Sequence, residues 1–176
     1  MDCTVGLFNE SFPPVMDGVA VCVQNYAYWL QKKVGGVSVV TPGKLGANYK
    51  QYPYEVLDYL AVPVPFRHPY VTGIAQMDPR LQAKLMRRHF KIVHAHSPFS
   101  AGLMGVQVAK RQKIPVVATF HSKFKDDFRK VIPSDMVVDQ AIKIVMEFFD
   151  HADEVWVPQA SVEEVIRYTL DEIRFA

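Results

Sequence analysis

Cysteine is scarce in this chain, which excludes a disulfide framework and a zinc–thiolate site. Cys3 and Cys22 are the only cysteines among 176 residues, whereas small disulfide-bonded domains and zinc–thiolate sites need more thiols. We therefore expect two buried free thiols in a reducing compartment. The chain also lacks an apolar run of about 18 residues, so we expect no helix that spans a membrane.

An excess of charge of one sign is lacking as well. Twenty basic side chains face 18 acidic ones, and the formal net charge of +2 excludes a dedicated nucleic-acid binder. The opening residues, MDCTVGLF, carry an acid in place of basic residues and lack the apolar length of a signal peptide. We therefore expect a cytoplasmic protein. Its hydrophobic share of 49% is enough for the core of one domain.

Short apolar runs alternate with amphipathic stretches along the whole chain. This pattern predicts an α/β fold, with a Rossmann-like parallel sheet flanked by helices. Strands are expected at 3–8, 37–42, 54–62, 91–96, 115–120 and 154–158. Helices are expected at 18–33, 78–90, 100–112, 134–150 and 161–170. Ligands bind beyond the carboxyl ends of such strands, which selects residues 9–18, 96–100 and 121–125 as candidate site loops.

Two histidines, His94 and His96, lie in the strand expected at 91–96. Side chains alternate along a strand, so both should point to the same face of the sheet. Such a pair supplies the first metal ligands along the chain in some metal-dependent hydrolases. Those enzymes, however, are generally barrels of about 250 residues. We expect no metal here, with His94 in the core and His96 in a pocket. A metal hydrolase that uses His94, His96 and His121 is the less favoured alternative.

His121 follows the strand expected at 115–120, so it should open onto the same edge as His96 and Ser97. An imidazole there can hydrogen-bond to a sugar hydroxyl or an oxyanion, or act as an acid or base. The alternative is a purely structural role, with His121 partly buried and its ring nitrogens hydrogen-bonded within the protein. Lys123 is the neighbouring cation that we expect within reach of an anion.

Asp17 is expected to cap a helix that begins at Gly18. The free N–H groups of the first turn and the small size of glycine would admit a phosphate or a sugar. An ordinary helix cap is the equally weighted alternative. Neither GxGxxG nor a Walker lysine is present, which excludes those two nucleotide motifs.

With these loops taken together, the sequence resembles the N-terminal domain of family-four glycosyltransferases, retaining enzymes of the GT-B fold. The resemblance covers nearly the whole chain, in the family's order, and HSPFSAGLMG beside TFHSKF is close to bacterial members that glucosylate lipids or glycans. The stretches that carry it are FPPVMDGVAVCVQNYAYWL, VSVVTP, IVHAHSPFSAGLMG, KIPVVATFHSKF and FFDHADEVWVP.

The resemblance implies that residues 1–176 form the acceptor-side half of a GT-B fold, and that the nucleotide-sugar domain lies outside them. The activity it implies is transfer of a sugar from a nucleotide sugar to a lipid or glycan hydroxyl, without a metal or other cofactor. His121 would be catalytic, by contacting the donor sugar or its leaving phosphate. The substrate-binding residues would be Asp17, Gly18, His96, Ser97, Pro98, Ser122 and Lys123. The isolated domain is expected to fold but to be inactive.

The chain departs from the family pattern at several places. Asp17-Gly18 stands where the family often has Gly-Gly, which alters the closest approach to the phosphates. The sequence VPQAS replaces the common Val-Pro-Ser, so Gln159 and Ser161 gain little support as site residues. Glu164 and Glu172 match the spacing of the second domain's Glu-x7-Glu motif, but they lack its Phe-Gly context. A non-catalytic sugar- or lipid-binding module and a sugar-nucleotide epimerase of the same fold stay open as alternatives.

The helix expected at 78–90 is basic and amphipathic. Such a helix can lie on the anionic inner face of a membrane, although a solvated helix over the sheet is the favoured interpretation. Its basic residues are Arg80, Lys84, Arg87, Arg88 and Lys91.

Overall fold

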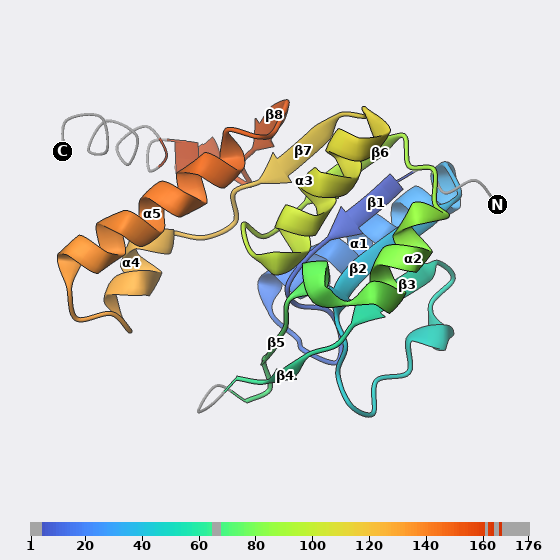
Figure 1. Ribbon diagram of the computed structural model, residues 1–176, viewed down its shortest axis with the longest axis horizontal. Helices are drawn as coiled ribbons and strands as arrows, with labels where there is room; N and C mark the ends of the chain where they lie inside the picture. The colour runs from blue at the N-terminus through green and yellow to red at the C-terminus, as the bar shows by residue number, and fades with distance from the viewer. Residues whose placement is uncertain (1–4, 65–67, 161, 164–165, 167–176) are drawn as a thin grey trace.

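The computed structural model describes residues 5–64, 68–160, 162–163 and 166. In this part of the chain, six parallel strands form one sheet in the order β3-β2-β1-β6-β7-β8. Helices cover both faces of the sheet (Figure 1), so the predicted Rossmann-like α/β fold is confirmed. The strands are β1 (Val5–Phe8), β2 (Val37–Pro42), β3 (Glu55–Tyr59), β6 (Ile92–Ala95), β7 (Val116–Thr119) and β8 (Glu154–Trp156).

Burial on both faces explains the apolar character of the central strands. Every residue of β1, β2 and β7 is buried, as in parallel sheets whose two faces are covered by helices. Strand β8 lies at the sheet edge, and its three residues are exposed. The carboxyl ends of β1, β6 and β7 are therefore neighbours at the centre of one edge, which we call the carboxyl edge.

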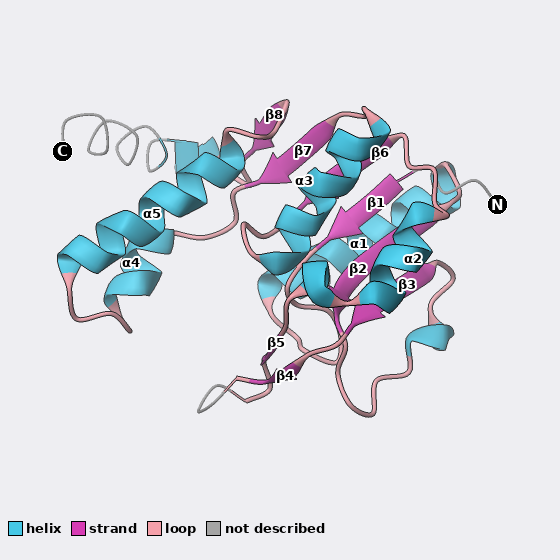
Figure 2. Cartoon of the chain, viewed as in Figure 1, coloured by secondary structure: helices cyan, strands magenta, loops and turns pink. Residues whose placement is uncertain are grey.

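The helices divide between the two faces (Figure 2). Helix α1 (Gly18–Lys33) packs on one face through Val23 and Ala27. The larger core lies on the other face, under α2 (Pro79–Met86), α3 (Ser100–Gln112) and α5 (Asp135–Phe149). Shorter elements are η1 (Tyr49–Gln51), η2 (Ala75–Met77), α4 (Phe124–Arg129) and an antiparallel hairpin of β4 (Val62–Pro63) and β5 (Val71–Thr72).

Residue types typical of helix ends predicted most helix boundaries correctly. Helices α1 and α3 have the predicted limits. The Gly35-Gly36 pair ends α1 with positive φ angles of 75° and 66°, which glycine adopts without steric cost. Asp78 caps α2 by accepting hydrogen bonds from the N–H groups of Arg80 and Leu81, and Pro79 occupies its first turn.

Two predicted segments differ from the structure. The helix expected at 78–90 ends at Met86, because the chain beyond it is held by Gln112 of α3. The Gln112 amide donates to the Arg88 carbonyl and accepts from the Phe90 N–H group. Helix α4 was not expected, since its six residues are mostly charged and only two of them, Phe124 and Phe128, carry the apolar spacing of a helix. The helix predicted at 161–170 lies largely outside the described residues.

Candidate functional site

The carboxyl edge brings His96 and His121 together, as the strand order predicts. His96 directly follows β6, and His121 lies just beyond β7. His96 Nδ1 lies 3.0 Å from His121 Nε2, at hydrogen-bond distance. The two rings are stacked, with their centroids 5.3 Å apart. We call His94, His96 and His121 the histidine cluster.

His94 forms the buried base of the histidine cluster. Its Nε2 atom lies 2.7 Å from the Thr119 hydroxyl oxygen, and its ring centroid lies 3.9 Å from that of His96. Rings of Tyr26 and Trp156 pack against it at centroid distances of 5.4 and 5.0 Å. Burial, together with a smaller effect of His121, lowers the pKa of His94 to about 4. His94 is thus the core histidine that the sequence indicates.

The other two imidazoles are also uncharged at neutral pH. Burial holds the pKa of His96 well below its usual value of 6.5, with smaller contributions from His94 and His121. Burial also lowers the pKa of half-buried His121, and the Asp17 carboxylate partly opposes this shift. A neutral imidazole has one N–H donor and one acceptor nitrogen, so each ring can both donate and accept. Among the described residues, His96 Nε2 has no hydrogen-bond partner although it is buried.

The start of α1 lies within electrostatic reach of the histidine cluster. Asp17 caps this helix, with its Oδ1 atom accepting from the Ala20 N–H group at 2.7 Å. Gly18 is exposed, and a Cβ atom built there would meet nothing within 4 Å. The space over the first turn is therefore open to a ligand, beside a helix terminus that favours negative charge.

Ser97 and Pro98 form a buried wall of the site. The Ser97 hydroxyl accepts a hydrogen bond from the Glu10 N–H group at 3.2 Å, which ties the loop after β1 to the loop after β6. A Cβ atom at Gly102 would lie 1.9 Å from the Ser97 carbonyl oxygen, so glycine is needed for α3 to approach this loop. Ser122 is half-buried, and Lys123 is exposed at the cap of α4.

Glu10 is a site-organising residue that the sequence did not single out. Its carboxylate accepts hydrogen bonds from the Ala101 N–H group at the start of α3 and from the Tyr59 hydroxyl. Burial raises the pKa of Glu10, although both hydrogen bonds act in the opposite direction. An acid directly after a buried strand at the carboxyl edge was the available signal.

Cys22 also faces the histidine cluster. It lies on α1 and is half-buried, so the prediction of a buried thiol is wrong for this residue; Cys3 lies outside the described residues. Ligand atoms of Cys22, His96 and His121 all lie within 4.8 Å of one another. His94 is not in this group among the described residues, so the structure does not bring together the set of His94, His96 and His121 that the metal-hydrolase alternative required.

An apolar groove runs along α1 beside the histidine cluster. Its volume is about 610 Å³. Tyr26 joins the two features, because its ring also packs against His96 at a centroid distance of 5.5 Å. Trp29 is 51% exposed and Val34 57% exposed, so this face of α1 presents apolar side chains to solvent. The lining residues are Cys22, Asn25, Tyr26, Trp29, Leu30, Lys33 and Val34.

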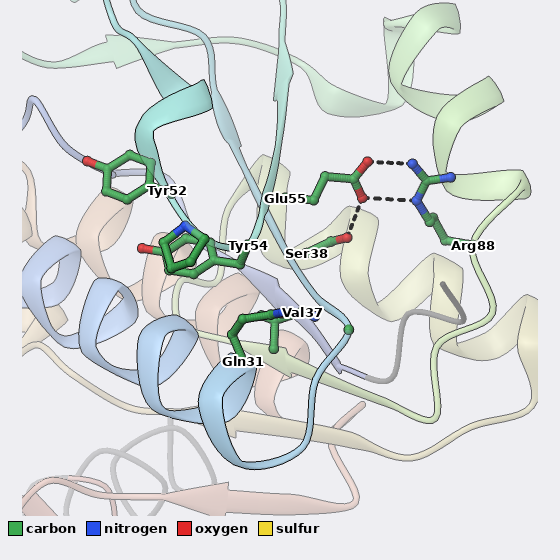
Figure 3. Close-up of a pocket in the computed structure, with 9 residues that line it drawn as sticks. Gln31, Val37, Ser38, Tyr52, Tyr54, Glu55 and Arg88 are labelled. Atoms are coloured by element: carbon green, nitrogen blue, oxygen red, sulfur yellow. Dashed lines mark hydrogen bonds and ion pairs between the residues drawn. The ribbon is translucent and has the colours of Figure 1, made fainter.

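A second cavity, of about 360 Å³, lies at the opposite edge of the sheet, at the amino ends of β2 and β3 (Figure 3). Its polar side chains bind each other: the Arg88 guanidinium donates to Glu55, and so does the Ser38 hydroxyl. The hydrogen bond from Arg88 is the main cause of the lowered pKa of Glu55. These paired charges, and the position away from the carboxyl edge, make this cavity a poor candidate site.

The basic segment forms a shorter helix than predicted, and two of its five basic side chains are held in ion pairs. Arg80 pairs with Asp78 at 3.1 Å, and Arg88 pairs with Glu55. Lys84, Arg87 and Lys91 are exposed. Because α2 leads into the amino end of β6, the last two of these lie at the edge opposite the histidine cluster.

The sequence matches Glycosyltransferase Family 4 over residues 16–173, most of its length. The chain belongs to this family. It is 26% identical over 170 residues to the alpha-monoglucosyldiacylglycerol synthase of Streptococcus pneumoniae, covering 92% of this chain and 36% of that protein. It is 28% identical over 122 residues to the enzyme of the same name from Acholeplasma laidlawii, covering 69% of this chain and 30% of that protein.

The chain therefore spans about a third of the length of the curated relatives it matches. Its parallel sheet agrees with half of the GT-B architecture that the family resemblance implies. None of the described helices is long and apolar enough to cross a bilayer. Gln159 is exposed, whereas Ser161, Glu164 and Glu172 lie outside the described residues.

Proposed function

We propose that this chain is the acceptor-side half of a retaining glycosyltransferase that moves a sugar from a nucleotide sugar to a lipid hydroxyl. The observation that carries the proposal is the meeting of His96 and His121 at the carboxyl edge, close to the start of α1. Family membership supports the reaction class. The names of the two synthases, which specify diacylglycerol, support a lipid acceptor.

His121 is the residue to which we assign the catalytic role. In this proposal its N–H group donates to the donor sugar or to the phosphate as the glycosidic bond breaks. The open first turn of α1 beside Gly18 adds N–H groups and the positive end of the helix dipole. Donors fixed in advance at the place where charge develops stabilise the transition state without a metal.

The groove along α1 suits the apolar part of a lipid acceptor. It lies next to the polar histidine cluster and is joined to it through Tyr26. A molecule with a hydroxyl-bearing head and an acyl chain would place the head at the histidine cluster and the chain along Trp29 and Val34. A free saccharide has no apolar part to fill this groove, so we favour a lipid over a glycan.

The nucleotide of the donor would be held by a second domain outside these 176 residues. Closure of the two domains would exclude water from the reacting bond. The 176-residue chain alone is accordingly expected to fold and to bind an acceptor, but to transfer no sugar.

The test is sugar transfer by the longer protein that contains this chain, with a panel of nucleotide sugars and with diacylglycerol in mixed micelles. His121→Ala should lower kcat about 100- to 1,000-fold, as removal of one transition-state hydrogen-bond donor does elsewhere. His151→Ala, at an exposed histidine outside the histidine cluster, is the matched control and should transfer normally. Full activity of His121→Ala would favour a non-catalytic lipid-binding role for this domain.

A further inference from the structure

Exposed apolar side chains gather where the chain leaves β3. Leu60 directly follows this strand and is 73% exposed, and Met77 at the end of η2 is 75% exposed. Val62 on β4 and Ile74 before η2 are each more than half exposed. We call Leu60, Val62, Ile74 and Met77 the hairpin surface. Exposed apolar side chains that gather in one place, unlike scattered ones, mark an interaction site.

Backbone contacts hold the base of the hairpin together. The Leu60 N–H group donates to the carboxylate of Asp78 at 2.9 Å, which brings Leu60 beside the residue that follows Met77. A Cβ atom at Gly73 would lie 2.2 Å from the Leu60 carbonyl oxygen, so glycine is needed for the returning chain to approach this closely. Ile74 is the next residue. The exposed side chains at the base of the hairpin therefore form one local surface.

The hairpin surface lies at the same carboxyl edge as the histidine cluster. The Ala75 N–H group donates to the hydroxyl of Ser100, the first residue of α3, at 2.7 Å. The N–H group of the next residue, Ala101, binds the Glu10 carboxylate. The hairpin of β4 and β5 projects away from the sheet near the end of β3 (Figure 1). Its base is thus fixed to the loops of the candidate site.

The charge of the surrounding loops is basic. Residues 43–54 and 59–77 contain no aspartate or glutamate, and the first of these stretches carries Lys44 and Lys50. The Lys44 ammonium group donates to the Pro69 carbonyl oxygen at 2.9 Å, which places this cation beside the hairpin. Apolar side chains flanked by cations, without acids between them, match the surface of an anionic lipid bilayer.

We propose that the hairpin surface inserts into the headgroup region of an anionic membrane and holds the carboxyl edge against it. The choice of a membrane over a protein partner rests on the proposed function, because a lipid acceptor lies in a bilayer. Apolar burial and attraction to anionic lipids are the two contributions that bind a peripheral protein. In this orientation the head of the acceptor lies at the same edge as the histidine cluster.

The basic segment that follows Asp78 does not suit this orientation. Arg87 and Lys91 lie at the edge opposite the histidine cluster, where the chain enters β6. A membrane bound there would face away from the reacting groups. The hairpin surface is thus a different contact from the basic helix that the sequence indicated.

Flotation of the 176-residue chain with vesicles that lack diacylglycerol tests this inference. Phosphatidylcholine vesicles that contain phosphatidylglycerol should bind the chain roughly 10-fold or more tightly than phosphatidylcholine alone, given about fivefold for each lysine near an anionic surface. Leu60→Glu and Met77→Glu should each weaken binding about 10-fold or more, since burial of one such side chain has at least that value. Circular dichroism confirms that each variant is folded.

Two control variants separate the hairpin surface from other contacts. Met136→Glu matches Met77→Glu in residue type and in exposure, at 74% against 75%, but lies on α5; it should bind like the unmodified chain. Arg87→Gln, in the basic segment, should also bind normally. Equal loss in both methionine variants, a greater loss in Arg87→Gln, or no binding to either kind of vesicle would overturn the inference. The measurement uses neither donor nor acceptor, so these outcomes would leave the proposed transferase function intact.

Discussion

The Nδ1 atom of His96 and the Nε2 atom of His121 lie 3.0 Å apart and join the loops that follow β6 and β7. Directly beneath them, His94 bonds to the last residue of β7, Thr119. The Ser97 hydroxyl, in turn, holds the loop after β1 through the Glu10 N–H group. Three loops far apart in the sequence are therefore fixed to one another, and this ordering in advance is what a transition-state binding site requires.

Stability should fall in mild acid because of His94. The pKa of its imidazole is about 4 in the folded chain and near 6.5 when unfolded, so the unfolded state binds more protons as the pH falls. The contribution is fully present above pH 6.5 and is lost progressively from there down to about pH 4. It amounts to about 2 kcal/mol between pH 7 and pH 5. Urea unfolding at both pH values measures it.

His94→Gln is the control for this prediction. It removes the titrating group, so its free energy of unfolding should depend less steeply on pH between 7 and 5. An identical slope in the variant would show that other groups cause the acid sensitivity.

Substitution by alanine should lower the stability of the fold at Gly102 but not at Gly18. At Gly102 a Cβ atom would lie 1.9 Å from the Ser97 carbonyl oxygen, so Gly102→Ala should destabilise the fold by about 1–3 kcal/mol or more. At Gly18 the Cβ atom meets nothing, so Gly18→Ala should keep full stability. Thermal unfolding compares the two.

If Gly18 admits the donor phosphates, Gly18→Ala should raise KM for the nucleotide sugar in the longer protein while the fold is unchanged. An unaltered KM would remove Gly18 from the binding site.

Glu10 should matter for stability more than its loop position suggests. Glu10→Ala removes the acceptor for the Ala101 N–H group and the Tyr59 hydroxyl, and should cost about 1–2 kcal/mol, the range of a lost helix cap and hydrogen bond. Glu10→Gln keeps an acceptor oxygen and should cost less. Denaturant unfolding ranks the three proteins, and equal stability of all three would contradict the assigned role.

The groove along α1 should contribute to lipid binding. Trp29→Glu places a charge on its apolar wall and should weaken association with diacylglycerol-containing phosphatidylcholine vesicles by about tenfold, since loss of apolar contact worth about 1.4 kcal/mol has that effect. Met136→Glu is the matched control, because Met136 is 74% exposed on α5, outside the groove. Flotation with vesicles compares them, and equal loss in both variants would point to a general charge effect.

Much of this architecture could be read from local sequence signals. Apolar runs marked the buried strands, while Asp17, Gly35-Gly36 and Asp78-Pro79 marked helix ends because their effects are confined to the adjacent turn. The meeting of His96 and His121 followed from strand order. These signals needed no knowledge of side-chain packing.

Other features depended on tertiary contacts that no local pattern encodes. Helix α2 ends early because Gln112, on a different helix, takes over the hydrogen bonds of the following backbone. Cys22 was expected in the core, yet the rotation of α1 on the sheet turns it toward the histidine cluster. The role of Glu10 required knowing that α3 begins beside β1.

The most direct test of the central claim is a comparison of His121→Ala with His151→Ala for sugar transfer by the longer protein, at saturating donor and lipid acceptor. If the meeting point of β6, β7 and α1 is where the sugar reacts, His121→Ala should lose about 100- to 1,000-fold in kcat and His151→Ala should lose nothing. Equal rates for the two variants would contradict that claim.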